Sequence, residues 1–156
     1  MTKRRIYVAS SWRNDTQPHV VALLRMAGHD VYDFKNPKGG SKGFSWSEID
    51  PDWQNWTAKQ YREALDHPIA CQGYTFDMRA MEWADTCVLV LPCGRSAHLE
   101  AGWFSGRGKH TIILTQDGEE PELMALMCNH IVSSMEEVLE CLGTPGALEV
   151  PASDAA

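Results

Sequence analysis

Residues 86–104 decide the fold. They begin with the apolar run Thr86-Cys87-Val88-Leu89-Val90-Leu91 and continue with the loop sequence Pro92-Cys93-Gly94-Arg95-Ser96 and a helical pattern over 97–104. A continuous apolar run between turn signals is typical of a strand buried on both faces of a parallel sheet. Gly106 and Gly108 end the helical pattern. The stretch therefore predicts a strand, a tight loop and a helix, which together form half of an α/β unit.

The rest of the chain repeats this alternation. Further strands are predicted at residues 6–9, 30–34, 111–114 and 131–132, and helices at 20–26, 56–66, 71–83, 121–127 and 135–142. This order predicts a doubly wound, mostly parallel five-stranded α/β sheet of the flavodoxin or Rossmann type. We expect one domain over residues 1–145 and a flexible tail over 146–156, which is rich in small residues.

Composition narrows the classes of function. The 156 residues are 44% hydrophobic and 22% charged, which is ordinary for a globular domain. Fourteen Lys and Arg against 21 Asp and Glu give a net charge of −7, which argues against a nucleic-acid polymer or an anionic membrane as partner. The five cysteines form no CxxC pair and the six histidines lack ligand spacing, so we expect a reducing cytoplasm and no metal site.

Phosphate-binding and cofactor motifs are absent from the sequence. It contains no GxGxxG, no GxxxxGK[ST] and no GxSxG, so we expect no bound dinucleotide or other cofactor. In open α/β sheets, ligands bind beyond the carboxyl ends of the strands. Three loops leave such ends, at residues 9–15, 35–55 and 92–100. They supply polar and aromatic candidates for ligand binding: Ser10, Ser11, Trp12, Arg13, Arg95, Ser96 and His98.

Three residues are candidates for chemistry, and each has a structural alternative. Glu100 lies in the first turns of the helix after the central strand, where it faces the crevice or only complements the helix dipole. Asp77 lies on the preceding helix, where it points to the same crevice or to solvent. Tyr7 alternates with Ile6 and Val8 on the first strand, so it is a core residue or a site residue.

Three sequence blocks carry a family resemblance. They are Ile6-Tyr7-x4-Trp12, Asp77-x7-Asp85 and Gly94-x5-Glu100-x-Gly102. In this order, around a central strand, they resemble the nucleoside 2-deoxyribosyltransferase family, which includes related N-glycoside hydrolases of nucleoside monophosphates. The resemblance covers roughly residues 4–135, and its most specific part is the block from Asp77 to Gly102.

The resemblance implies roles for these residues. Glu100 matches the nucleophile that attacks the anomeric carbon, Tyr7 the tyrosine that orients it, and Asp77 the aspartate that contacts the substrate and assists proton transfer. Such a mechanism passes through a covalent glycosyl ester, which water or a second base then resolves with retention. The resemblance also implies a doubly wound α/β fold and a homo-oligomer of two or more chains with shared active sites.

Two positions depart from the family pattern. Gly94 stands where many transferases have an aspartate that contacts the base, and Glu122-Leu123-Met124 stands where the family has Asn-Leu-Met, whose asparagine approaches a neighbour's sugar 5′ group. The choice between nucleoside and 5′-monophosphate therefore stays open. We expect the lid and base pocket in residues 44–56, with Trp46 and Asp50 as binding residues.

Two other functions use the same pocket. One is a binding module that holds a nucleotide-like ligand without turnover. The other is the cleavage of nicotinamide from a dinucleotide, which breaks the same type of bond. The sequence does not give the base preference, the choice of ribose or deoxyribose, or the choice of hydrolysis or transfer.

Overall fold

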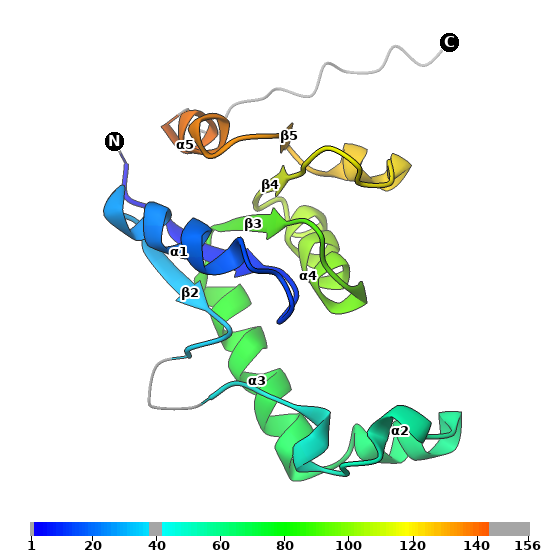
Figure 1. Ribbon diagram of the computed structural model, residues 1–156. Helices are drawn as coiled ribbons and strands as arrows, with labels where there is room; N and C mark the ends of the chain where they lie inside the picture. Colours follow the sequence, from blue (N-terminus) through cyan, green and yellow to red (C-terminus); the bar gives the residue numbers. More distant parts are fainter. Residues whose placement is uncertain (1, 38–41, 144–156) are drawn as a thin grey trace.

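The computed structural model describes residues 2–37 and 42–143, which form one sheet with helices on both faces (Figure 1). The strands are β1 Arg5–Ala9, β2 Asp30–Asp33, β3 Thr86–Val90, β4 His110–Leu114 and β5 His130–Val132. The α-helices are α1 Gln17–Met26, α2 Ala58–Ala64, α3 Pro68–Trp83, α4 Arg95–Gly106 and α5 Met135–Gly143. Short 3-10 helices are η1 Trp46–Glu48, η2 Trp53–Asn55 and η3 Leu123–Met127. The tail expected over 146–156 lies outside the described residues.

The sheet has the strand order β2-β1-β3-β4-β5, and every neighbouring pair is parallel. This confirms the predicted five-stranded parallel α/β fold. The strand order changes direction between β1 and β3, which pair side by side from Ile6↔Thr86 to Ala9↔Leu89. The loops that follow these two strands therefore diverge, and this is where ligands bind in folds of this type.

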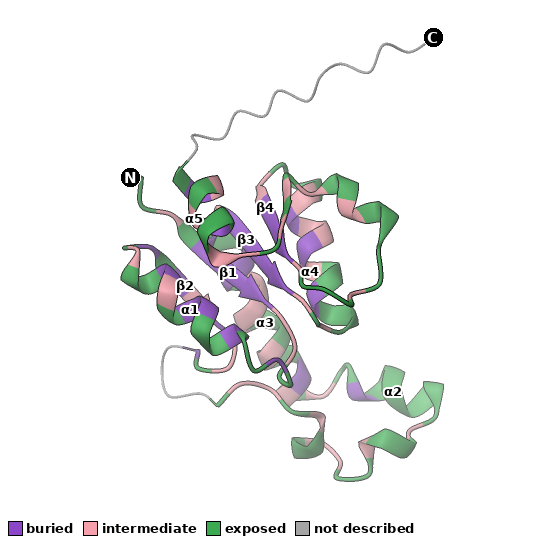
Figure 2. Ribbon diagram, turned by 45° about the horizontal axis from the view of Figure 1, so that its top comes forward, coloured by how far each residue is buried: buried purple, intermediate pink, exposed green. Residues whose placement is uncertain are grey.

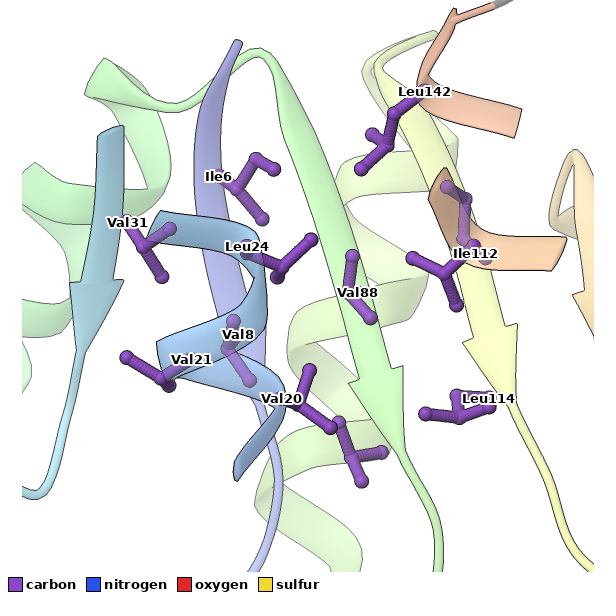
Figure 3. Close-up of a cluster of buried hydrophobic side chains, with 12 residues drawn as sticks. Ile6, Val8, Val20, Val21, Leu24, Val31, Val88, Ile112, Leu114 and Leu142 are labelled. Atoms are coloured by element: carbon purple, nitrogen blue, oxygen red, sulfur yellow. The ribbon is translucent and has the colours of Figure 1, made fainter. Parts of the chain in front are cut away.

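Alternation along the strands gives each face its own core. On one face, Ile6 and Val8 pack with α1 and α5 through a set of buried aliphatic side chains (Figure 3). On the other face, Tyr7 and Ala9 pack with residues of α3 and α4. Figure 2 shows the buried residues concentrated in the sheet and on the helix faces toward it. The second face carries the polar groups of interest, because Tyr7 points to α3 and α4.

Helix boundaries follow local capping. Helix α3 begins at Pro68, three residues before the predicted start, because the ring Nδ1 of His67 accepts a hydrogen bond from Ile69 N (3.1 Å). Helix α2 begins after a capping box, in which the Thr57 hydroxyl accepts from Gln60 N (3.2 Å) and the Gln60 side chain accepts from Thr57 N (2.8 Å). These caps divide the region after the second strand into two helices, as predicted.

The predicted long connection forms an arm beside α3. Figure 1 shows η1, η2 and α2 extending away from the sheet, beyond the N-terminal end of α3. Its interior is aromatic: the ring of Trp46 lies 4.7 Å from Phe44, 5.6 Å from Trp56 and 6.1 Å from Tyr61, with edge-to-face geometry. Among residues 2–37 and 42–143, no helix is both long and apolar enough to cross a membrane.

Candidate active site

The loops after β1 and β3 are joined by side-chain hydrogen bonds. The Ser10 hydroxyl donates to Val90 O (2.8 Å), and the Asn14 amide donates to Pro92 O (3.0 Å) and, more weakly, to Val90 O (3.4 Å). The Asn14 side-chain oxygen accepts from the backbone N–H groups at the start of α1. Ser10 was predicted to bind ligand, but its hydroxyl proton is engaged by the end of β3. These contacts fix the crevice.

Two tyrosines lie side by side on the face of the sheet toward α3 and α4. Tyr7 and Tyr32 are register partners on β1 and β2, and their rings stack with centroids 5.4 Å apart and planes 15° apart. Phe104 of α4 covers the other side of Tyr7, at 5.6 Å. Tyr7 has no exposed surface, whereas Tyr32 is half-buried. The pair is therefore held by strand pairing and by packing.

Each tyrosine faces one carboxyl group. The Tyr32 hydroxyl donates to Asp77 Oδ1 on α3 at 3.0 Å. The Tyr7 hydroxyl approaches the carboxyl of Glu100 on α4 and lowers its pKa. Within the described residues this hydroxyl has no hydrogen bond of ordinary geometry, so its interaction with Glu100 is looser than that of Tyr32 with Asp77. The structure thus brings together the three residues predicted for chemistry and adds Tyr32.

Burial and mutual charge dominate the electrostatics of this group. Burial, followed by the charge of Asp77, raises the pKa of Glu100 from 4.5 to about 8, against the opposing contact from Tyr7. Burial also raises the pKa of Asp77, and the hydrogen bond from Tyr32 opposes that rise. No cation among the described residues lowers either pKa. The pKa of about 8 favours protonated Glu100 at neutral pH, beside a second carboxyl whose pKa is also raised.

A cavity of about 330 Å³ opens beside Asp77, between α3 and the loop after β2. Its walls are mainly aromatic and aliphatic, with a few polar groups, as is usual for small-molecule sites. The lining residues are Tyr32, Phe34, Pro37, Lys42, Gly43, Phe44, Glu48, Ile69, Gln72, Gly73, Phe76 and Asp77. On α3, Ile69, Gln72, Gly73, Phe76 and Asp77 share one side because they recur at spacings of three and four residues.

The start of α4 presents other predicted binding residues. Gly94 is its N-cap residue, and a side chain added there would meet open space. Arg95 and Ser96 are exposed in the first turn. His98 donates from Nδ1 to Gly94 O (2.9 Å), and its Nδ1 lies 3.5 Å from Cys93 Sγ. Burial and then Glu100 raise the pKa of the Cys93 thiol to about 11, which makes it a poor nucleophile.

The loop after β1 places its predicted residues near the cavity wall. The Trp12 ring packs edge-on against Phe34 at 5.4 Å and covers Gly43. Ser11 Oγ accepts a hydrogen bond from the backbone N–H of Arg13 (3.2 Å). The Arg13 side chain is exposed, and its guanidinium has no hydrogen bond or ion pair with another described residue, so it can contact solvent or an anion. Trp12 therefore supports the cavity from outside, and Arg13 stands at the loop surface.

Three predicted binding residues lie apart from the carboxyl pair. Asp50 accepts a hydrogen bond from Trp56 Nε1 at 2.6 Å and lines a separate hollow on the arm. Trp46 packs inside the arm and does not line the cavity beside Asp77. Glu122 Oε1 accepts from Met124 N (3.0 Å) at the start of η3, so its carboxylate is turned toward its own backbone.

The prediction missed Tyr32, Gln72 and Phe76. Tyr32 alternates with Val31 and Asp33 as Tyr7 does with Ile6 and Val8, which is a signal once the two strands are known to pair in register. Gln72 and Phe76 already lie in the predicted helix 71–83 that carries Asp77, and their four-residue spacing beside that of Gly73 and Asp77 is the signal that places them on one side. Within the described residues, no group of three or more His, Cys, Asp or Glu could hold a metal ion.

Comparison with known proteins extends this description. No protein-family model and no curated protein matches the chain. The 2-deoxyribosyltransferase of Bacillus psychrosaccharolyticus has a similar structure, with a TM-score of 0.54 and 19% identity over 85% of this chain and 88% of that one. The CMP N-glycosidase BcmB of Clostridium botulinum is similar over 90% of this chain and 100% of its own, with a TM-score of 0.51 and 18% identity. These matches confirm the resemblance at the level of the fold.

Proposed function

We propose that this chain is an enzyme that cleaves the N-glycosidic bond of a (2′-deoxy)nucleoside or its 5′-monophosphate. The sugar passes through a covalent glycosyl ester on Glu100 to water or to another base. The observation that carries the proposal is the juxtaposition of two half-buried carboxyls, Glu100 and Asp77, each faced by a tyrosine, beside an aromatic cavity. The two solved structures of similar fold are named for a 2-deoxyribosyltransferase and a CMP N-glycosidase, which supports the same class of chemistry.

The reaction uses the two carboxyls in different roles. As the bond between C1′ and the base nitrogen breaks, its electron pair stays with the base, and a Glu100 oxygen forms the new bond to C1′. The proton that Glu100 holds passes to Asp77 and from there to the departing base. In the second half, water or another base attacks C1′, loses a proton to the pair and releases Glu100. Two inversions give net retention.

The departing base occupies the cavity beside Asp77 in this proposal. Phe34, Phe44 and Phe76 provide flat apolar walls for a planar ring. The Gln72 amide lines the same cavity and offers one donor and one acceptor to the edge of the base. This assignment places the base between α3 and the loop after β2, with the sugar toward Glu100.

The sugar 5′ group faces the loops after β1 and β3 in this arrangement. Arg13, Arg95 and Ser96 are exposed there and supply donors for a phosphate. Glu122 does not oppose this arrangement, because its carboxylate bonds to its own helix. A 5′-monophosphate and a free nucleoside are therefore both substrates to test.

A homo-oligomer accompanies the proposed function. Helix η3 exposes four large apolar side chains in sequence, namely Leu123, Met124, Leu126 and Met127, each more than half exposed. Such a run is typical of a surface that a second chain covers. Light scattering on the purified protein tests this, and a monomer at working concentration contradicts it.

A substrate panel tests the activity. The protein is incubated with nucleosides and their 5′-monophosphates, with and without an acceptor base, and products are separated by chromatography. Free base alone indicates a hydrolase, and a new nucleoside indicates a transferase. The Glu100→Ala variant is expected to lose at least a hundredfold in kcat, whereas Glu136→Gln, at an exposed position of α5, keeps wild-type turnover. Full activity of Glu100→Ala contradicts the proposal.

Trapping separates an enzyme from a binding module. A 2-fluoro-arabinosyl nucleoside slows the release of the sugar, so an enzyme accumulates the ester. Mass spectrometry should then find the added sugar on the peptide that contains Glu100. Tight binding without an adduct supports a binding module, and release of nicotinamide from NAD supports the dinucleotide alternative.

A further inference from the structure

Asp77 accepts a hydrogen bond from Tyr32, a residue that has no part in the reaction proposed above. Tyr32 donates to Asp77 Oδ1 at 3.0 Å, while Tyr7 serves Glu100. The two phenols come from register partners on neighbouring strands, and the two carboxyls come from the two helices that cover that face. The site therefore contains two phenol–carboxyl pairs, of which the Tyr32–Asp77 pair has the better hydrogen-bond geometry.

We propose that Tyr32 is a positioning residue of the reaction, whose hydroxyl orients the Asp77 carboxyl and stabilises its negative charge as the proton passes to the departing base. This inference rests on the proposed function. Proton donation leaves Asp77 as a carboxylate in a half-buried site. Lys42 lines the same cavity but is exposed, and it is not among the causes that shift the pKa of Asp77. The hydrogen bond that the phenol donates, at 3.0 Å, is then the direct compensation for that charge.

The electrostatics of the two carboxyls agree with this role. The charge of ionised Asp77 is one cause of the raised pKa of Glu100, so ionised Asp77 favours the protonated form of Glu100. The hydrogen bond from the Tyr32 hydroxyl lowers the pKa of Asp77, because it favours the ionised form. In the proposed reaction it therefore makes protonated Asp77 a stronger acid toward the departing base.

Other titratable groups lie around Asp77 and Glu100, and none replaces Tyr32 as the hydrogen-bond donor to Asp77. The phenol of Tyr7 faces Glu100, and the thiols of Cys87 and Cys93 stay neutral because burial raises their pKa. Three more titratable residues lie near Tyr32 and Asp77. The charge of Asp33 raises the pKa of Tyr32, and Lys42 and Glu48 line the cavity. Only Tyr32 donates a hydrogen bond to the Asp77 side chain within the described residues.

Tyr32→Phe isolates the hydroxyl. The variant keeps the ring that stacks on Tyr7 and loses the donor to Asp77. We expect kcat to fall about tenfold with KM little changed, and the acidic limb of the kcat/KM profile to move to higher pH by roughly one unit, because Asp77 then holds its proton more tightly. The control is Tyr74→Phe on α3, the helix that carries Asp77. The Tyr74 side chain is 68% exposed, and this variant should match the wild type.

A substrate whose base leaves without protonation sharpens the test. An N7-methylated purine nucleoside carries a positive charge on its base, so cleavage needs no proton from Asp77. The Tyr32→Phe defect should shrink to less than twofold with this donor. If the Tyr32→Phe enzyme cleaves substrate but the acidic limb of its kcat/KM profile lies at the same pH as in the wild type, the inference is overturned.

Two further measurements separate the possible failures. Carbon NMR of labelled Asp and Glu side chains follows the titration of Asp77 in the free protein, where Tyr32→Phe should raise its midpoint whatever the activity. If Tyr32→Phe does not fold, 3-fluorotyrosine at position 32 provides a stronger donor and should move the acidic limb to lower pH. A wild type that cleaves no substrate overturns the proposed function and with it the role of Tyr32, and an unchanged Asp77 titration overturns the Tyr32 inference alone.

Discussion

Tyr7 and Tyr32 pair in register on β1 and β2, and their rings stack with centroids 5.4 Å apart. Neighbouring strands lie about 4.8 Å apart, so the sheet itself sets the spacing of the two phenols. Each phenol faces a carboxyl from a different helix, Glu100 of α4 and Asp77 of α3. The spacing of the carboxyls thus depends on how α3 and α4 pack on the sheet, and not on a flexible loop.

Glu100→Gln should stabilise the protein at alkaline pH. The pKa of Glu100 is raised from 4.5 to about 8 in the folded state, so folding favours its protonated form. Its contribution is fully present below about pH 4.5 and is lost as the pH rises through 8. Glutamine stays neutral, so the variant should gain about 2–3 kcal/mol of unfolding free energy at pH 9, after allowance for partial exposure. Urea unfolding at pH 5, 7 and 9 measures the gain.

The pH dependence of this gain distinguishes its cause. At pH 5 both side chains are neutral, and the two proteins should differ by less than about 1 kcal/mol. Glu136→Gln, at an exposed position of α5, should show no such trend. An equal gain at pH 5 and pH 9 would mean that packing, and not ionisation, stabilises the variant.

Gly73→Ala should narrow the cavity beside Asp77. A Cβ at this position would lie 3.0 Å from Phe44 Cβ and 3.2 Å from its ring, so Phe44 must move. Phe44 lines the cavity assigned to the base. We expect KM to rise about five- to tenfold with a smaller change in kcat, because uniform binding is lost rather than transition-state contacts. Steady-state kinetics on the best substrate of the panel measures both constants.

Gly106→Ala is the matched helical control for this variant. An added Cβ at Gly106 meets nothing within 4 Å, and the residue ends α4 away from the cavity. Its kinetics should equal those of the wild type, and stability should rise by about 0.5–1 kcal/mol because alanine favours the helix. Unchanged KM in Gly73→Ala would place the base elsewhere.

The fold was predictable because its signals are local. The apolar run at 86–91 and the alternation of strands and helices suffice for a parallel sheet. Helix starts were less accurate, since the cap that His67 provides before Pro68 involves a ring nitrogen, which sequence rules for caps do not include. The arm that contains η1 and η2 was seen only as a long connection, because its aromatic contacts join residues far apart in sequence, such as Trp46 and Tyr61.

The site was only partly predictable. Tyr7, Asp77 and Glu100 were candidates because of their positions on the predicted elements and because of the family resemblance, and the structure brings them together. Tyr32 was missed because its importance depends on the register of β1 with β2. Trp46 and Asp50 were assigned to the base pocket because they lie in the long connection, where flat side chains suit a planar ring, but Trp46 packs within the arm and Asp50 bonds to Trp56 there. Loop residues lack a periodic pattern, so sequence alone does not give their direction.

Lys109→Met should destabilise the protein. The Lys109 ammonium donates to Met81 O, Glu82 O and Ala84 O at 2.9, 3.0 and 2.6 Å, and so satisfies carbonyls at the end of α3. It also lies 5.2 Å from the centre of the Trp103 ring. Methionine retains the apolar stem but donates nothing, so we expect a loss of about 1–3 kcal/mol. Thermal unfolding should show a Tm lower by several degrees.

The exposed Lys59 gives the comparison for this variant. Its ammonium lies 3.8 Å from Glu63 in an exposed ion pair on α2. Lys59→Met should change stability by less than about 0.5 kcal/mol. If both lysine variants lose the same amount, the loss reflects net charge and not the capping of α3.

Acid stability should depend on His110. Burial, and then the neighbouring His130 and Arg4, lower its pKa from 6.5 to about 4, and its Nδ1 is buried without a hydrogen-bond partner among the described residues. The unfolded chain therefore binds a proton that the folded chain rejects, and stability falls as the pH drops from about 6.5 toward 4, by about 1–2 kcal/mol at pH 5. His110→Phe preserves an aromatic contact with His130 and should remove this loss. Denaturant unfolding at pH 7, 6 and 5 measures it, with the exposed His19→Asn as control. A His110→Phe protein that loses stability as steeply as the wild type would assign the acid sensitivity to another group, such as His29, whose pKa burial also lowers.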